Sequence, residues 1–99
     1  MSLSKTDLNL FLVFDAVYEE RNLTRAARLL HITQPAVSNA LKRLRLAFND
    51  PLFVRTPRGV APTPVAENIA GQVKEALNLL TISLSESERF LPQRSEKVF

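Results

Sequence analysis

Apolar residues recur at helical spacing in three consecutive stretches of the chain, at residues 6–20, 23–30 and 33–48. In each stretch they fall on one face of a helix. The residues on these faces are Leu10, Phe11, Phe14 and Val17, then Leu23, Ala26, Ala27 and Leu30, then Val37, Leu41, Leu44 and Phe48. The pattern predicts three amphipathic helices around one core.

The second and third of these helices are separated by a short break and read together as a helix-turn-helix. Thr33 can cap the third helix, because its side-chain oxygen can accept a hydrogen bond from the first turn, and the fixed φ of Pro35 suits that turn. Asn22 or Thr24 can cap the second helix in the same way. The small pair Ala26-Ala27 allows two steeply crossing helices to approach closely.

A β-hairpin is expected after the third helix. The Asn-Asp-Pro sequence at 49–51 ends that helix, since proline disfavours the helical conformation in the residue before it. The sequence Thr-Pro-Arg-Gly at 56–59 then has the proline and glycine of a tight turn. The extended runs on either side are residues 52–55 and 60–62. Phe53 is expected to contact the core, whereas Arg55 and Arg58 would project from the strand and the tip.

A long fourth helix is predicted from Thr63-Pro64, which repeats the cap-then-proline signal, to about Ser87. At about 25 residues it would be about 37 Å long, more than a domain of this size covers by itself. We therefore expect it to pair with a second copy of the chain, with packing against the first helix as the alternative. The residues expected in this dimer interface are Leu8, Leu12, Ile69, Val73, Ala76, Leu77, Leu80 and Leu84.

The net charge of +3 is unevenly distributed. Between Arg21 and Arg58 there are eight Lys or Arg against one acid, Asp50, whereas the residues from Thr63 onward carry four bases and five acids. The outer face of the third helix is polar towards its start and basic towards its end, and it carries no acid. A basic surface of this kind usually meets a polyanion, and a merely solvated face is the alternative.

The amino-acid composition argues against several other classes of protein. The chain has no cysteine and one histidine, so disulfides and thiolate metal sites are excluded, and we expect neither a metal nor a cofactor. His31 lacks a neighbouring acid to orient it, which disfavours an enzyme. No apolar run reaches the roughly 18 residues of a membrane span, and the N-terminus does not look like a signal peptide. We expect a soluble protein of the cytoplasm.

The sequences TRAARLLHITQPAVSNALKRLR and DPLFVRTPRGVAPTPVAE closely resemble the N-terminal domain of LysR-type transcriptional regulators. The resemblance covers roughly residues 6–90. It implies a mainly α fold with a small β-hairpin, in which a winged helix-turn-helix is followed by a long linker helix. It also implies sequence-specific binding of double-stranded DNA by a homodimer on the bacterial nucleoid, with the recognition helix in a major groove and the wing in the adjacent minor groove.

The resemblance assigns base reading to Gln34, Pro35, Ser38 and Asn39, and it assigns the wing contact to Arg55. The chemistry agrees, since Gln and Asn can each pair with adenine and proline can contact a thymine methyl group. Many members have Arg where this chain has Asn39, which shifts that contact towards adenine or phosphate. Arg58 would join Arg55 in the minor groove. The expected phosphate contacts are Arg25, Arg28, Thr33, Lys42 and Arg43.

Three segments follow from this interpretation. Residues 1–62 would form the DNA-binding domain, residues 63–88 the dimerisation helix, and residues 89–99 the start of a hinge. Members of the family carry a small-molecule effector domain after the hinge, so we expect this chain to be a fragment that lacks it, and a dimer of dimers remains open for the longer protein. The rival interpretation is a winged helix that binds another protein.

Overall fold

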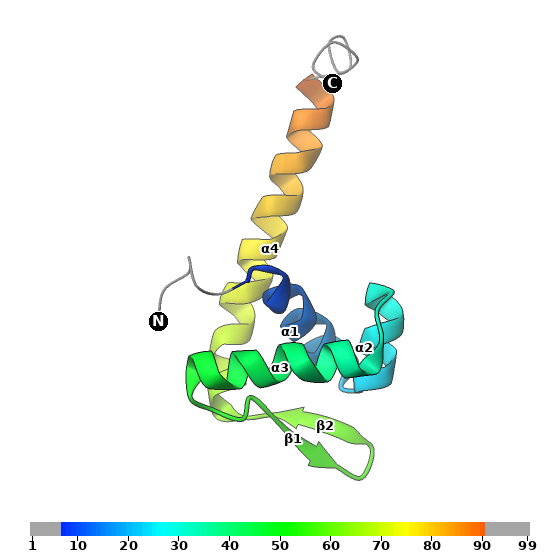
Figure 1. Ribbon diagram of the computed structural model, residues 1–99. Coiled ribbons are helices and arrows are strands. Elements are labelled where there is room, and N and C mark those ends of the chain that lie inside the picture. Colours follow the sequence, from blue (N-terminus) through cyan, green and yellow to red (C-terminus); the bar gives the residue numbers. More distant parts are fainter. Residues whose placement is uncertain (1–6, 91–99) are drawn as a thin grey trace.

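The computed structural model describes residues 7–90, which form four helices and one two-stranded antiparallel sheet (Figure 1). The elements are α1 (Asn9–Glu20), α2 (Leu23–Leu30), α3 (Gln34–Phe48), β1 (Phe53–Thr56), β2 (Gly59–Pro62) and α4 (Pro64–Phe90). The first three helices and the hairpin form a head, and α4 projects well beyond it. This arrangement confirms the predicted fold class.

Polar side chains set the starts of α2 and α3. The Oδ1 atom of Asn22 accepts a hydrogen bond from the amide of Arg25 at 2.9 Å, and Oγ1 of Thr33 accepts one from the amide of Ala36 at 3.2 Å. Each bond satisfies an amide that has no partner inside its own helix. The predicted cap at Thr33 is confirmed, and Asn22 is the cap of α2, because Thr24 lies within that helix.

Left-handed residues end the first three helices. The backbone φ is 57° at Arg21, 59° at His31 and 54° at Asn49. A residue in this conformation directs the chain sharply away from the helix axis while its amide still bonds to the last turn. The chain can therefore fold α1, α2 and α3 back around one core without long connections.

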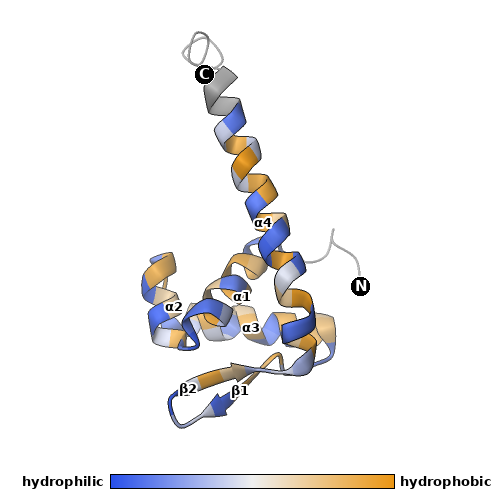
Figure 2. Ribbon diagram, turned by 180° about the vertical axis from the view of Figure 1, so that it is seen from behind, coloured by the Kyte–Doolittle hydropathy of each residue, from blue (hydrophilic) through white to orange (hydrophobic). Residues whose placement is uncertain are grey.

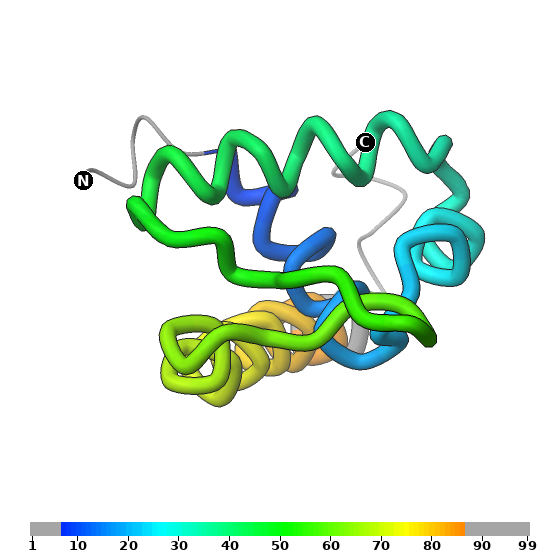
Figure 3. Tube along the Cα trace, turned by 90° about the horizontal axis from the view of Figure 1, so that it is seen from below, coloured from blue at the N-terminus to red at the C-terminus, as the bar shows by residue number. Residues whose placement is uncertain are grey.

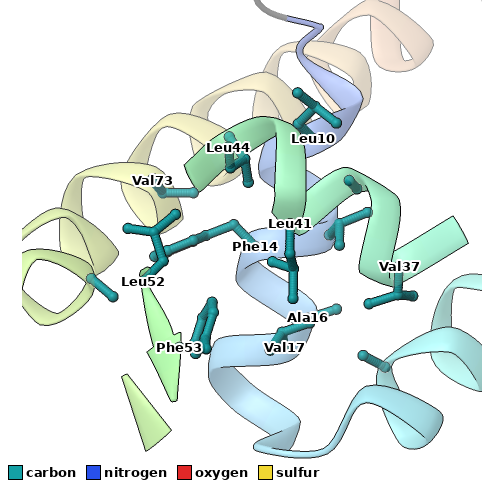
Figure 4. Close-up of a cluster of buried hydrophobic side chains, with 14 of the residues drawn as sticks. Leu10, Phe14, Ala16, Val17, Val37, Leu41, Leu44, Leu52, Phe53 and Val73 are labelled. Carbon is teal, nitrogen blue, oxygen red and sulfur yellow. The ribbon is translucent and has the colours of Figure 1, made fainter. Parts of the chain in front are cut away.

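Buried side chains from α1, α3, the hairpin and α4 meet in this core (Figure 4). Phe14 is central to it, with its ring centroid 5.4 Å from that of Phe53. The predicted apolar faces supply most of the core, but Val13, Ala16 and Ala40 are buried as well. Val13 and Ala16 are buried because α1 contacts α2, α3 and α4 and is covered on more than one side, and Ala40 lies on α3, which contacts both α1 and α2.

The hairpin differs from the prediction by one position on each side of the turn. Thr56 and Gly59 pair with each other, which leaves a two-residue turn. Leu52, expected in the first strand, precedes β1 and has a φ of 65°. Its amide donates to the Asp50 carboxylate, and its carbonyl accepts from the amide of Thr63. Its backbone hydrogen bonds therefore hold the connection between α3 and β1 and are not part of the sheet. The core contact of Phe53 is confirmed.

The first turns of α4 pack against α1. Apolar burial comes from Ala66, Ala70 and Val73. Beside this seam, the hydroxyl of Tyr18 donates to Oε1 of Glu67 at 2.8 Å. Nζ of Lys74 lies 2.9 Å from Oδ1 of Asp15 and 3.5 Å from Oε2 of Glu19. The direction in which α4 leaves the head is therefore set by both apolar and polar contacts.

Beyond Leu77 the described side chains of α4 are exposed through residue 86, and several of them are apolar (Figure 2). Val73 was predicted to lie between two copies of the chain but is buried within one chain, at 8% exposure. For this position the alternative, packing against α1, holds. The helix also continues to Phe90, so residues 89 and 90, which were predicted to begin the hinge, belong to it. The rest of the predicted hinge, 91–99, lies outside the described residues.

Among the helices of residues 7–90, none combines the length and the apolarity that crossing a bilayer requires.

Candidate nucleic-acid interface

The outer face of α3 carries the four predicted base-reading residues. Gln34, Pro35, Ser38 and Asn39 are all exposed, and they lie in the first half of the helix. Their spacing of one, three and one residues places them on a single side, opposite the buried Val37, Ala40, Leu41 and Leu44. The cap at Thr33 starts this helix directly before Gln34, so the four predicted base-reading residues occupy its first two turns.

The hairpin lies beside α3 on the face of the molecule that points away from the projecting end of α4 (Figures 1 and 3). A shallow groove of about 430 Å³ separates the two elements. Gln34 and Ser38 line it from α3, Arg55 lines it from β1, and Asn22 and Thr24 line it from the start of α2. The structure thus brings two predicted base readers and the predicted wing arginine to one concave surface.

None of the five predicted phosphate contacts lines that groove. Lys42 and Arg43 are exposed further along α3, whereas Arg25 and Arg28 line a separate shallow depression on α2, together with Glu20 and Leu29. Arg58 is exposed in the turn of the hairpin. The basic residues therefore form three patches, on α2, along α3 and on the hairpin.

Among the side chains that the structure describes, none of the eight Lys and Arg residues between positions 21 and 58 pairs with a carboxylate. The ion pairs among the described side chains all involve Lys74, which lies at the seam between α1 and α4. Two of the eight, Arg21 and Arg45, make hydrogen bonds to backbone carbonyls. Nε of Arg21 donates to Tyr18, and Nε of Arg45 donates to Pro51 at 3.0 Å.

Arg45 also lines the groove, as do Asn22 and Thr24, and none of the three was among the predicted contact residues. For the start of α2 the sequence contained one indication of a binding site, since a helix that begins at a cap presents free backbone amides there. It held no signal that the hairpin would lie beside the start of α2, because that proximity joins residues more than thirty positions apart.

Two shifted pKa values lie away from this surface, at the α1–α4 seam. The hydrogen bond to Glu67, together with partial burial, raises the pKa of Tyr18 above 10.0. The hydrogen bond to Asp15 raises the pKa of Lys74 above 10.5. Neither group lies on the outer face of α3. Among the side chains that the structure describes, no three acidic or histidine residues gather in a way that could hold a metal ion.

The family model for bacterial regulatory helix-turn-helix proteins of the lysR family matches residues 8–67, a span that contains α1 to the start of α4 and the whole groove. The chain belongs to the lysR family. Its winged helix-turn-helix is the N-terminal domain of a LysR-type regulator, as the resemblance implied.

Curated relatives match the chain along its whole length. It is 53% identical over 97 residues to the HTH-type transcriptional regulator LeuO of Escherichia coli K12, covering 98% of this chain and 31% of LeuO. It is 48% identical over 99 residues to the HTH-type transcriptional activator NahR of Pseudomonas putida, covering all of this chain and 33% of NahR. The chain thus spans about a third of the length of these relatives.

Solved structures show the same fold. A probable transcriptional regulator of Pseudomonas aeruginosa, PA0477, superposes with a TM-score of 0.82 at 46% identity, over 85% of this chain and 28% of that one. The DNA-binding domain of BenM, crystallised in complex with catB site 1 DNA, superposes with a TM-score of 0.79 at 28% identity. That match covers 87% of this chain and 97% of the BenM domain.

Proposed function

We propose that this domain binds double-stranded DNA in a sequence-specific way, with α3 in a major groove and the hairpin in the adjacent minor groove. The observation that best supports this proposal is the exposed outer face of α3, which carries no acid. It lies beside a hairpin with two arginines, Arg55 and Arg58, that form no ion pair among the described side chains. The relatives support this proposal through their names as transcriptional regulators, and the BenM domain does so through its DNA complex.

Base reading falls to the first two turns of α3. Gln34 and Asn39 can each offer a donor and an acceptor to adenine, Pro35 can contact a thymine methyl group, and Ser38 can bond a base edge or a phosphate. Arg55 and Arg58 have the charge and reach that favour a narrow, electronegative minor groove. Sequence specificity would then depend on both α3 and the hairpin, the two elements that border the shallow groove on the protein surface.

Affinity would come mainly from phosphate contacts. Lys42 and Arg43 lie along α3 beyond the reading residues, and Thr33 precedes them at the helix start. Arg25 and Arg28 would contact phosphates from α2, outside the groove. Each cation that neutralises a phosphate releases a counterion, which makes such binding strongly dependent on salt. This mode of action involves no covalent chemistry.

We further propose that two copies pair through α4. Leu80 and Leu84 are 56% and 68% exposed, and Leu8 and Leu12 add apolar surface on α1. An exposed apolar surface of this kind usually marks an interaction site. The remaining interface residues are Ile69, Ala76 and Leu77. In the longer protein, a dimer of dimers, an effector domain and a cytoplasmic location on the nucleoid would follow from the family.

A selection from random duplexes tests the DNA-binding proposal. The intact chain is incubated with a pool of duplexes, bound sequences are enriched, and the winner is titrated against a scrambled duplex at two salt concentrations. We expect an enriched motif and an affinity that falls as salt rises. Absence of salt-dependent binding at micromolar protein would overturn the proposal in favour of a protein-binding role.

A further inference from the structure

The first residue of β2, Gly59, lies directly against the backbone of Arg21. Its φ is +149°, a value that residues with a side chain rarely adopt. A Cβ atom added to Gly59 would lie 2.2 Å from the carbonyl oxygen of Arg21. Because that oxygen belongs to the backbone, it cannot move aside as the end of a flexible side chain could. Only glycine permits the hairpin to approach this closely.

A hydrogen bond holds the two segments together at the same place. The amide of Val60 donates to the carbonyl of Arg21 at 3.0 Å. This bond lies outside the sheet, since it joins the hairpin to the turn between α1 and α2. The hairpin is thus fixed at its base by the buried ring of Phe53 and near its tip by the backbone of Arg21.

The carbonyl of Arg21 is itself held in position. Arg21 has a left-handed φ of 57°, and its amide donates to the carbonyl of Val17 at 2.8 Å. Its guanidinium lies 4.7 Å from the ring centroid of Tyr18, and its Nε donates to the backbone of Tyr18. The side chain therefore folds back onto α1 and leaves the carbonyl directed at the hairpin.

The sheet register connects this contact to the wing arginine. Val60 pairs with Arg55, so the residue whose amide is held by Arg21 lies directly across the sheet from Arg55. Fixing Val60 therefore fixes the backbone of Arg55. It also fixes the separation between Arg55 and the reading residues Gln34 and Ser38, which line the same groove.

We propose that the backbone carbonyl of Arg21 is a positioning group for DNA reading, which holds the hairpin through Gly59 and Val60 so that Arg55 reaches the minor groove while α3 occupies the major groove. This inference rests on the proposed function for its consequence on DNA. The contact is made by the carbonyl oxygen of Arg21. The positive charge of the Arg21 side chain therefore takes no part in it.

Spin-label distances test the anchor without DNA. The chain has no cysteine, so Thr56→Cys on the hairpin and Leu29→Cys on α2 give one labelled pair at two exposed positions. Gly59→Ala adds the clashing atom at Gly59. Val60→Pro leaves Gly59 unchanged, but it removes the amide hydrogen and puts the ring carbon Cδ in its place, against the Arg21 carbonyl. We expect a narrow distance distribution in the parent and a shifted or broadened one in both variants. Gly71→Ala is the matched control, because a Cβ there meets nothing within 4 Å.

Binding by unlabelled proteins then tests the consequence. On the selected duplex, Gly59→Ala and Val60→Pro should lose about tenfold in affinity and lose their preference for A·T-rich over G·C-rich flanks, the loss expected for one reading contact. Base preference at the α3 positions should persist. Gly71→Ala, the matched control, should bind like the parent and show the same salt dependence.

The outcomes separate the two proposals. An unchanged distance distribution in both Gly59→Ala and Val60→Pro overturns the anchor. A displaced hairpin that still discriminates the flanks overturns the positioning role and contradicts the placement of Arg55 in the minor groove. If the parent itself binds no duplex, the proposed function fails, while the distance measurement still decides the anchor.

Discussion

The hydroxyl of Thr63 donates a 2.7 Å hydrogen bond to Oδ2 of Asp50 and so ties the start of α4 to the end of α3. The same carboxylate oxygen accepts the amide of Leu52 at 2.8 Å, and Oγ1 of Thr63 accepts the amide of Ala66 at 3.2 Å. One hydroxyl thus caps α4 and fixes its origin. Asp50 is the single acid between residues 21 and 58, and its carboxylate serves this junction.

Replacing Asp50 should therefore weaken the whole head. Asp50→Ala leaves the Leu52 amide and the Thr63 hydroxyl without their acceptor, at a cost of about 1–3 kcal/mol in the free energy of unfolding. Asp50→Asn keeps an accepting oxygen and should cost less. Urea unfolding followed by circular dichroism measures both. Equal stability of the Ala variant and the parent would contradict the role given to this carboxylate.

Leu52 combines complete burial with a left-handed backbone, which leads to an unusual order of stabilities. Truncating a buried leucine costs about 2–5 kcal/mol. The left-handed conformation costs a residue with a side chain roughly 1–2 kcal/mol, which glycine avoids. We therefore expect Leu52→Gly to be destabilised, but about 1 kcal/mol less than Leu52→Ala. At Leu41, buried to the same extent inside α3, the order of the two variants should be reversed.

The sequence was sufficient for the elements because their signals are local. The cap at Thr33, the following Pro35 and the apolar spacing of α3 all act within one or two turns, and the structure has them where they were predicted. The same holds for the start of α4 at Thr63. Local signals also predicted which side of α3 is exposed, since the side opposite a buried stripe must face outward.

What the sequence could not supply are contacts between distant segments. The burial of Val73 depends on how α4 crosses α1, and the left-handed backbone of Leu52 depends on bonds to Asp50 and Thr63. The close approach of Gly59 to Arg21 joins two turns that are 38 residues apart in number. The spacing of residues within a single helix or strand does not predict any of these three contacts.

Tyr18 allows a direct test of the α1–α4 seam, because it is the only tyrosine and the chain has no tryptophan. Its pKa lies above 10.0 chiefly because its hydroxyl donates to Glu67. The folded state thus favours the protonated phenol. Its contribution to stability is complete below the unfolded pKa near 10 and is lost as pH rises through the higher folded value.

Ultraviolet absorbance of the tyrosinate measures this titration. We expect a midpoint above 10.0 in the parent and a lower midpoint in Glu67→Ala, which lacks the acceptor. Glu75→Ala removes an exposed acid elsewhere on α4 and should leave the midpoint unchanged. Lys74 follows the same direction, since its pKa is raised by Asp15, so thermal stability should also decline above pH 10.5. A midpoint that does not respond to Glu67→Ala would contradict the assigned cause.

Substitutions of Gln34 and Lys42 should affect DNA binding in different ways. Gln34→Ala removes a donor and acceptor from the reading face, and we expect a loss of about 1–3 kcal/mol confined to one base position. Lys42→Ala removes one phosphate contact, which should weaken binding to all sequences alike and lower the salt slope by about 1. Titrations on the selected and scrambled duplexes compare them. Equal losses on both duplexes for Gln34→Ala would remove its reading role.

The pairing of α4 is tested by placing charge on its exposed apolar side. Leu80→Glu and Leu84→Glu should leave the head folded, since both side chains extend beyond the packed turns of α4, yet each would bury an unpaired carboxylate in a dimer. Leu29→Glu is the matched control, because Leu29 is 57% exposed on α2 and lies outside the proposed interface. Sedimentation should show a dimer for the parent and the control, and monomers for the two α4 variants. Dimers in all four proteins would contradict pairing through this surface, whereas a monomeric parent would contradict pairing altogether.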